Sequence, residues 1–154
     1  MVKVQITKNG LTPFKFIVST KDIDLINDVD GNKFNDEIEI TGNVVDGGKL
    51  FNVEGTIKCQ KSFICDRCLV QSTENQIHNF NEEVEIQDVD DGFIDIAEMI
   101  RDTVMAAQPI KNLCKEDCKG LCPICGANLN ENECNCDRFV VDPRLEALKN
   151  FLQE

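Results

Sequence analysis

Hydrophobic positions alternate with polar ones through much of the first ninety residues, a pattern typical of half-buried β-strands. The alternation runs through 2–6, 14–18, 38–45, 51–59 and about 74–86. We therefore predict a strand in each of these segments.

A glycine-rich turn separates two of these strands. Residues 46–49 read Asp-Gly-Gly-Lys, and glycine reaches positive φ without steric cost, so a hairpin is expected here. The second strand of the hairpin places Val53, Ile57 and Cys59 on one face. Cys59 is accordingly expected to be a small core residue.

Two helices are expected after the strands. In the first, Asp95 and Glu98 have capping-box spacing and Pro109 follows its end. Its predicted buried stripe is Ile96, Ile100, Thr103, Val104 and Ala107. The second helix begins at Asp142-Pro143 and carries Leu145, Leu148 and Leu152. Strands followed by helices predict an α+β fold with a mainly antiparallel β-sheet or partial barrel.

Length and composition limit the class of protein. The 154 residues correspond to one domain, or to one domain with a small appendage, and 42% of them are apolar, enough for a core. No apolar run approaches the roughly 18 residues of a membrane span. The first residues lack the apolar segment of a secretory signal, so we expect a cytoplasmic protein.

The charge is strongly acidic. Sixteen Lys and Arg against 28 Asp and Glu give a net charge of −12, and 82–102 is the densest acidic stretch. This stretch is either a solvated surface or a contact for a basic partner. A broad RNA-coating surface is not expected, because such surfaces need an excess of cations.

Eight of the nine cysteines fall into four close pairs, and six of the nine lie between 114 and 136. The pairs are Cys65/Cys68, Cys114/Cys118, Cys122/Cys125 and Cys134/Cys136. We expect an acidic β-rich body over 1–108, and a cysteine-rich metal-binding tail over 109–154 that packs on it. In a reducing compartment such pairs are typical of zinc ligands, and eight ligands suit two zinc ions.

The sequence leaves the grouping of these pairs open. Our preferred arrangement joins Cys122/Cys125 to Cys134/Cys136, and Cys65/Cys68 to Cys114/Cys118, so that the second group attaches the tail to the sheet. A rival arrangement places the four cysteines from 114 to 125 in one site. A third has a single zinc ion, with the remaining thiols free.

Catalysis is not expected. The chain has no glycine-rich phosphate loop and no Ser/His/Asp set, and a zinc ion closed by four thiolates has no place for a reactive water. The single histidine, His78, is expected to be an ordinary sheet residue.

Several motifs together resemble the YceD family, the large-ribosomal-RNA-subunit accumulation proteins of bacteria and plastids. Cys65-Asp66-Arg67-Cys68-Leu69 is similar to the C-x-R-C-L mark of that family, and 94–109 to the acidic helix that follows it. The runs 118–130 and 142–145 resemble its cysteine-rich, Gram-positive-type branch. The resemblance covers roughly residue 35 to the end.

The resemblance implies a non-enzymatic role in ribosome assembly that supports 23S rRNA accumulation. One mechanism is a small RNA contact near the cysteines, made by Lys61, Arg67, Lys115, Lys119 and Arg138. In the other, the acidic face holds a basic ribosomal protein or assembly factor of the large-subunit precursor. We favour the second, because the composition suits a basic partner. Neither a membrane nor a small-molecule substrate is expected as a partner.

The competing class is a redox-regulated, zinc-binding holdase or sensor. Cysteine pairs that share zinc can release it on oxidation and expose apolar surface. No long switch region separates the pairs at 122–125 and 134–136.

Overall fold

The main feature of the fold is an antiparallel sheet of five strands. The computed structural model describes residues 2–7, 10–25 and 32–137. The strands are β2 (Leu11–Val18), β3 (Lys33–Phe34), β4 (Ile38–Asp46), β5 (Leu50–Ile64) and β6 (Gln71–Glu85). β5 is central: β4 and β3 pair with it, as does β6, and β2 extends the sheet beyond β4. A separate pair consists of β1 (Lys3–Gln5) and β7 (Phe93–Asp95).

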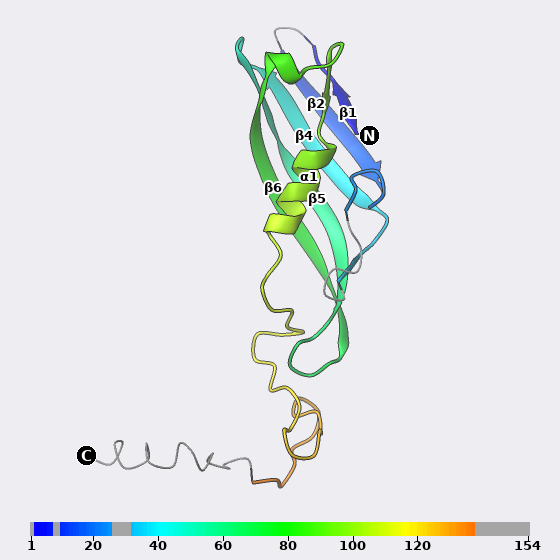
Figure 1. Ribbon diagram of the computed structural model, residues 1–154, viewed down its shortest axis with the longest axis vertical. Helices are drawn as coiled ribbons and strands as arrows, with labels where there is room; N and C mark the ends of the chain where they lie inside the picture. Colours follow the sequence, from blue (N-terminus) through cyan, green and yellow to red (C-terminus); the bar gives the residue numbers. More distant parts are fainter. Residues whose placement is uncertain (1, 8–9, 26–31, 138–154) are drawn as a thin grey trace, which may run out of the picture.

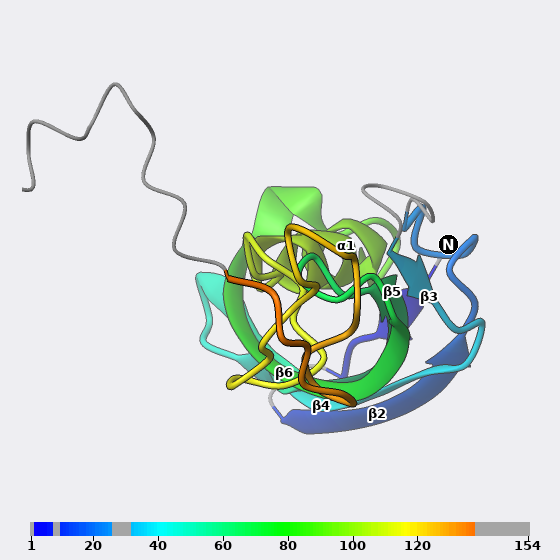
Figure 2. The ribbon, with the colours of Figure 1, turned by 90° about the horizontal axis from the view of Figure 1, so that it is seen from below.

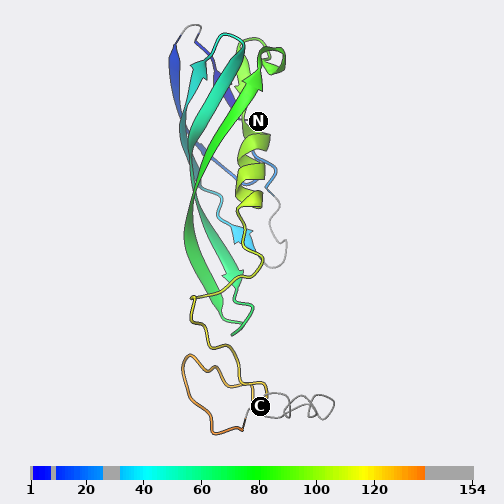
Figure 3. The ribbon, with the colours of Figure 1, turned by 90° about the vertical axis from the view of Figure 1, so that its left-hand side faces the viewer.

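One helix covers the sheet. A short 3₁₀ turn (Ile86–Asp88) follows β6, and α1 (Ala97–Ala106) comes after β7. α1 lies along one face of the sheet, which curves around it (Figures 1, 2 and 3). Ile100 and Val104 of α1 are fully buried and join the core formed by the inward positions of β2, β4 and β5. The predicted α+β class and mainly antiparallel sheet are confirmed.

The sheet is open and not a closed barrel, because the outer strands β2 and β6 do not pair with each other in the described part of the chain. Two details differ from the sequence-based expectation. Asp95 lies in β7, where its carboxylate accepts the N–H of Ala97 at 3.0 Å, while Glu98 pairs with Arg101. The capping box therefore does not form. Ala107 is exposed, since it falls after the last helical turn.

The expected second helix, from Asp142 onward, lies outside the described residues, as does Arg138. Within 107–137 the chain forms turns and an isolated bridge between Leu121 and Asn128. The division into a body over 1–108 and a tail over 109–154 stays a prediction. None of the helices that the structure describes is long and apolar enough to cross a membrane.

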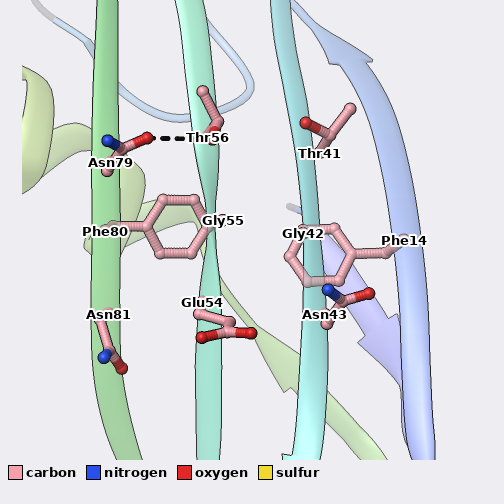
Figure 4. Close-up of a pocket in the computed structure, with 10 residues that line it drawn as sticks. All are labelled: Phe14, Thr41, Gly42, Asn43, Glu54, Gly55, Thr56, Asn79, Phe80 and Asn81. Carbon is pink, nitrogen blue, oxygen red and sulfur yellow. Dashed lines mark hydrogen bonds between the residues drawn. The ribbon is translucent and has the colours of Figure 1, made fainter.

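The predicted hairpin is confirmed and contains two facing glycines. Gly42 of β4 pairs with Gly55 of β5. Added side-chain carbons would meet Phe14 and Phe80, whose rings lie beside the two glycines (Figure 4). Phe14 and Phe80 are both buried. The glycines thus make room for two aromatic rings in the core.

Candidate metal centres

Eight cysteine sulfurs gather in two groups of four. The first group joins the end of the β5–β6 hairpin to the tail, and the second lies wholly in the tail. Their members are Cys65, Cys68, Cys114 and Cys118 in the first, and Cys122, Cys125, Cys134 and Cys136 in the second. The sulfurs within each group all lie within 4.8 Å of one another. This is the grouping preferred from the sequence, and the rival set from 114 to 125 is not found.

The spacing of the sulfurs fits a tetrahedral metal ion. The Sγ atoms of Cys65 and Cys118 are 3.8 Å apart, and those of Cys68 and Cys114 are 3.6 Å apart. With a zinc–sulfur bond of about 2.3 Å, tetrahedral geometry puts two sulfurs about 3.8 Å apart. A disulfide would bring them to about 2 Å. None of the nine cysteines forms a disulfide. The sulfur spacing of each group is therefore that of a metal-ligand set.

Two short turns with the same backbone pattern present the first cysteine pair of each group. In the first turn, the N–H of Leu69 donates to the carbonyl of Cys65 at 2.9 Å, and the N–H of Cys65 to that of Val70 at 3.0 Å. In the second, Gly126 donates to Cys122 at 2.9 Å, and Cys122 to Ala127 at 2.8 Å. Each C-x-x-C turn therefore directs two sulfurs to one side.

Neighbouring groups push the thiol pKa values apart. Burial tends to raise the pKa of Cys65, but the backbone N–H groups of Cys114 and Cys68 bring it down to about 6. Burial and the adjacent sulfur of Cys68 raise the pKa of Cys114 to about 12. Four neighbouring thiols cannot all ionise to thiolates without a cation between them, because the negative charges repel one another.

The second group behaves in the same way. The N–H groups of Cys125 and Ile124 lower the pKa of Cys122 to about 6. The sulfur of Cys125, together with burial, raises the pKa of Cys136 to about 12. A dication between the sulfurs would relieve this repulsion, which is why both groups are chemically suited to zinc.

A polar network near the first cysteine group joins the end of the β5–β6 hairpin to the tail. The carboxylate of Asp66 accepts the backbone N–H of Asn112 at 2.7 Å, and Asp66 N–H donates back to the Asn112 carbonyl at 2.9 Å. The ammonium of Lys61 donates to Asn112 Oδ1 at 2.7 Å. No spacing rule in the sequence indicates this role of Asn112, because its partners lie 46 and 51 positions away.

The prediction that Lys61 contacts RNA or a partner is wrong. Its side chain is fully buried, and its ammonium lies 5.4 Å from the centre of the Phe63 ring. Burial lowers its pKa. Lys61 is on the inward face of β5, so it is not available for a surface contact with RNA.

The other predicted contact residues near the cysteines differ in their roles. Arg67 is exposed, but its Nη1 donates to the carbonyl of Cys118 at 2.9 Å, so it also connects the hairpin to the tail. Lys115 and Lys119 are exposed; the ammonium of Lys115 lies 3.9 Å from Asp117. Asn130, which sequence reasoning missed, donates to Cys118 Sγ at 3.4 Å.

The acidic stretch folds into a groove between β6 and α1. The groove has a volume of about 480 Å³. Its walls carry five carboxylates and its apolar contacts come from Met99 and Ala106. The carboxylates are those of Glu82, Glu83, Asp95, Glu98 and Asp102. The sequence locates these acids, but the pairing of β6 with the helix face is a tertiary feature.

The fold and the two cysteine groups define a β-rich protein with two candidate four-thiolate metal centres. Residues 70–152 match the family described as "Large ribosomal RNA subunit accumulation protein YceD". The match spans more than half of the chain, which therefore belongs to the YceD family.

Two curated relatives share part of the chain. One, from Arabidopsis thaliana, is named "Large ribosomal RNA subunit accumulation protein YCED homolog 1, chloroplastic" and is 41% identical over 61 residues. An uncharacterized protein of Mycobacterium leprae is 35% identical over 91 residues. These matches cover 40% and 50% of this chain, and 19% and 42% of the respective relatives. No solved structure matches the chain.

Proposed function

We propose that this protein is a non-enzymatic assembly factor of the large ribosomal subunit, which supports the accumulation of 23S rRNA by binding a basic ribosomal protein in the cytoplasm. The family supports the ribosomal part of the proposal, because its description and the Arabidopsis relative's name both refer to accumulation of large-subunit rRNA. The acidic groove between β6 and α1 is the single observation that favours a basic protein as the direct partner.

The charge of the groove explains this preference. Arg101 is the only cation among 82–102, and it pairs with Glu98 and Asp102 at 3.0 Å. Lys and Arg side chains of a partner would gain from the remaining carboxylates, whereas RNA phosphates would be repelled. Ribosomal proteins that are not yet bound to rRNA expose a basic surface, which would complement the carboxylates of the groove.

In this proposal, zinc has a structural role. Each group of four cysteines would hold one ion; the first would fasten the hairpin to the tail and the second would shape the tail. A closed four-thiolate site offers no open coordination position, so we assign no reaction to either centre.

The test is affinity purification of the tagged protein from its host at moderate salt, with and without nuclease. We expect to recover a basic ribosomal protein that stays bound to the tagged protein after nuclease treatment. The matched test variant is the double substitution Glu82→Gln and Glu83→Gln, which removes two groove carboxylates that Arg101 does not pair with and should weaken the capture. Ribosomal proteins that disappear with nuclease would contradict the protein-first mechanism and favour RNA contact.

RNA contact near the cysteines is the alternative mechanism. Lys115 and Lys119 are exposed there, and they can be changed without touching the link made by Arg67. The double charge reversal Lys115→Glu and Lys119→Glu should leave ribosomal association intact if the partner is a protein. A loss of association, with zinc content unchanged, would support this alternative.

A redox-regulated holdase or sensor remains the second candidate function, favoured by the second cysteine group. Cys125 is exposed and both Cys134 and Cys136 are half-buried, so an oxidant can reach them. Reversible zinc loss under mild peroxide, accompanied by suppression of client aggregation, would support this function. Inert thiols would count against it.

A further inference from the structure

Leu69 has a backbone conformation that leucine rarely adopts. It follows Cys68 in the first C-x-x-C turn, and its φ is +57°. In the second turn the corresponding residue is Gly126, with φ +73°. The hydrogen bonds of the two turns match, so the turn itself requires a left-handed residue at this position. Glycine meets that requirement freely, whereas a leucine side chain is strained by it.

Among the described residues, the Leu69 side chain gains no packing in the core in return for this strain. Leu69 is 64% exposed, and the apolar cluster around the first cysteine group contains Leu113 but not Leu69. Two other aliphatic residues at the end of the hairpin are also exposed, Ile64 at 51% and Val70 at 42%. We call Ile64, Leu69 and Val70 the apolar tip. Strain together with exposure points to a contact beyond the described part of the chain.

We propose that the apolar tip inserts Leu69 into an apolar pocket of a basic protein, and so provides the anchoring contact of the complex. The inference rests on the proposed function and deepens it by naming the surface that binds. Aliphatic side chains held on a rigid turn bury well in a protein pocket, where a few central residues carry most of the binding energy.

Charge decides between a protein and RNA as the occupant of this surface. Protein–nucleic acid interfaces are polar and strongly cationic. The exposed cations near the tip are few: Arg67 already donates to the Cys118 carbonyl, Lys115 lies 3.9 Å from Asp117, and Lys119 is the third. The chain as a whole has a net charge of −12 and carries an acidic groove beside α1. A basic protein therefore complements the molecule that presents the tip, and RNA does not.

Because Leu69 is strained, substitutions at this position can distinguish an effect on binding from an effect on folding. Leu69→Gly removes the side chain and relieves the left-handed strain, so it should preserve the turn and its zinc content. Leu69→Ala removes the side chain but keeps the strain. The matched control is Leu11→Ala, because Leu11 is 60% exposed and lies beside the 46–49 turn, at the other end of the sheet.

The probes are the proteins of the large ribosomal subunit, extracted and separated individually, and a 23S rRNA transcript. Binding of the fluorescently labelled, zinc-loaded full chain is measured by anisotropy, with zinc content and thermal midpoint measured in parallel. We expect a basic ribosomal protein to bind the native chain and Leu11→Ala alike, and Leu69→Gly and Leu69→Ala at least tenfold more weakly. Leu69→Gly should keep its zinc, with an unchanged or higher midpoint.

The remaining outcomes are distinct. Equal binding by the native chain and Leu69→Gly would overturn the role of the apolar tip alone. Binding to the transcript but to no protein would overturn the protein partner while leaving a ribosomal role. Binding to neither probe would overturn the proposed function and this inference with it.

Discussion

Gly42 and Gly55 occupy facing positions in β4 and β5, where the core has space for the backbone but not for two more side chains. A Cβ on Gly55 would lie 2.5 Å from the Thr41 carbonyl oxygen and 2.7 Å from Phe80 Cζ. The alternation in the sequence places Gly55 on the inward face. Only the structure shows that Phe80, 25 positions later, fills the space above it.

Gly55→Ala should therefore destabilise the protein. The added methyl must displace backbone or the Phe80 ring, and overpacking of this kind costs about 2 kcal/mol. Urea unfolding followed by circular dichroism measures the change. Gly10→Ala is the control, because its nearest atom would be 4.0 Å away, and it should shift stability by less than about 0.5 kcal/mol. Equal effects of the two substitutions would contradict the packing argument.

Arg67 shows how a residue near the metal ligands can act without binding metal. Its guanidinium donates to the Cys118 carbonyl, and its own carbonyl accepts the N–H of Leu121 at 3.1 Å. Arg67→Ala should weaken zinc binding at the first group by about tenfold or more, as is usual when a residue that orients a ligand is removed.

Competition with a chromophoric chelator measures this affinity. Lys119→Ala is the control, because Lys119 contacts Asn130 through its backbone N–H, which the substitution keeps. Unchanged zinc affinity in Arg67→Ala would mean that the Cys118 segment is positioned by other contacts.

His78 provides a pH-dependent prediction. Burial on the inward side of β6 lowers its pKa below 6.5, so the unfolded chain takes up the proton first as the pH falls. His78 therefore contributes stability above pH 6.5 that is lost as the pH falls through its lowered folded-state pKa. The unfolding free energy of the native chain should decline relative to His78→Gln over this acidic range. A difference independent of pH would contradict the prediction.

At the scale of elements, five of the seven strands and α1 were predictable, because their apolar residues recur with the periods of a strand and a helix. The short strands β3 and β7 were not predicted, because two or three residues are too few to show a period. β6 begins at Gln71, earlier than expected. Its first residues show no alternating apolar pattern, and they are extended because they pair with the end of β5. Asp95 was assigned to a helix cap but lies in β7, where pairing with Lys3 of β1 decides its conformation.

The two cysteine groups differ in the elements they join, which leads to a prediction. The first connects the β5–β6 hairpin to the tail, whereas the second is local to 122–136. Cys118→Ser should reduce amide-exchange protection in both the hairpin end, 60–73, and the tail. Cys134→Ser should reduce it only within 122–136. Hydrogen exchange with mass spectrometry resolves the two patterns, and identical patterns would contradict the separation of the sites.

For the whole molecule, we expect two zinc ions per chain in reduced protein purified without chelator. Chelation should unfold the tail, because the zinc–thiolate bonds supply much of its folding free energy. The body should keep its circular dichroism, since its core is an apolar cluster separate from that around the first cysteine group. Elemental analysis that finds no zinc in reduced protein would contradict the zinc prediction.

The sequence by itself determined the local properties of this protein: the alternating strands, the turn at 46–49, the helix before Pro109, and the paired cysteines that mark metal ligands. These depend on neighbours within a few residues, where period and spacing act directly. Only the tertiary structure decided the grouping of the cysteine pairs, the burial of Lys61 and the groove that gathers the acids. These depend on residues far apart in the chain, whose meeting is set by strand register and core packing.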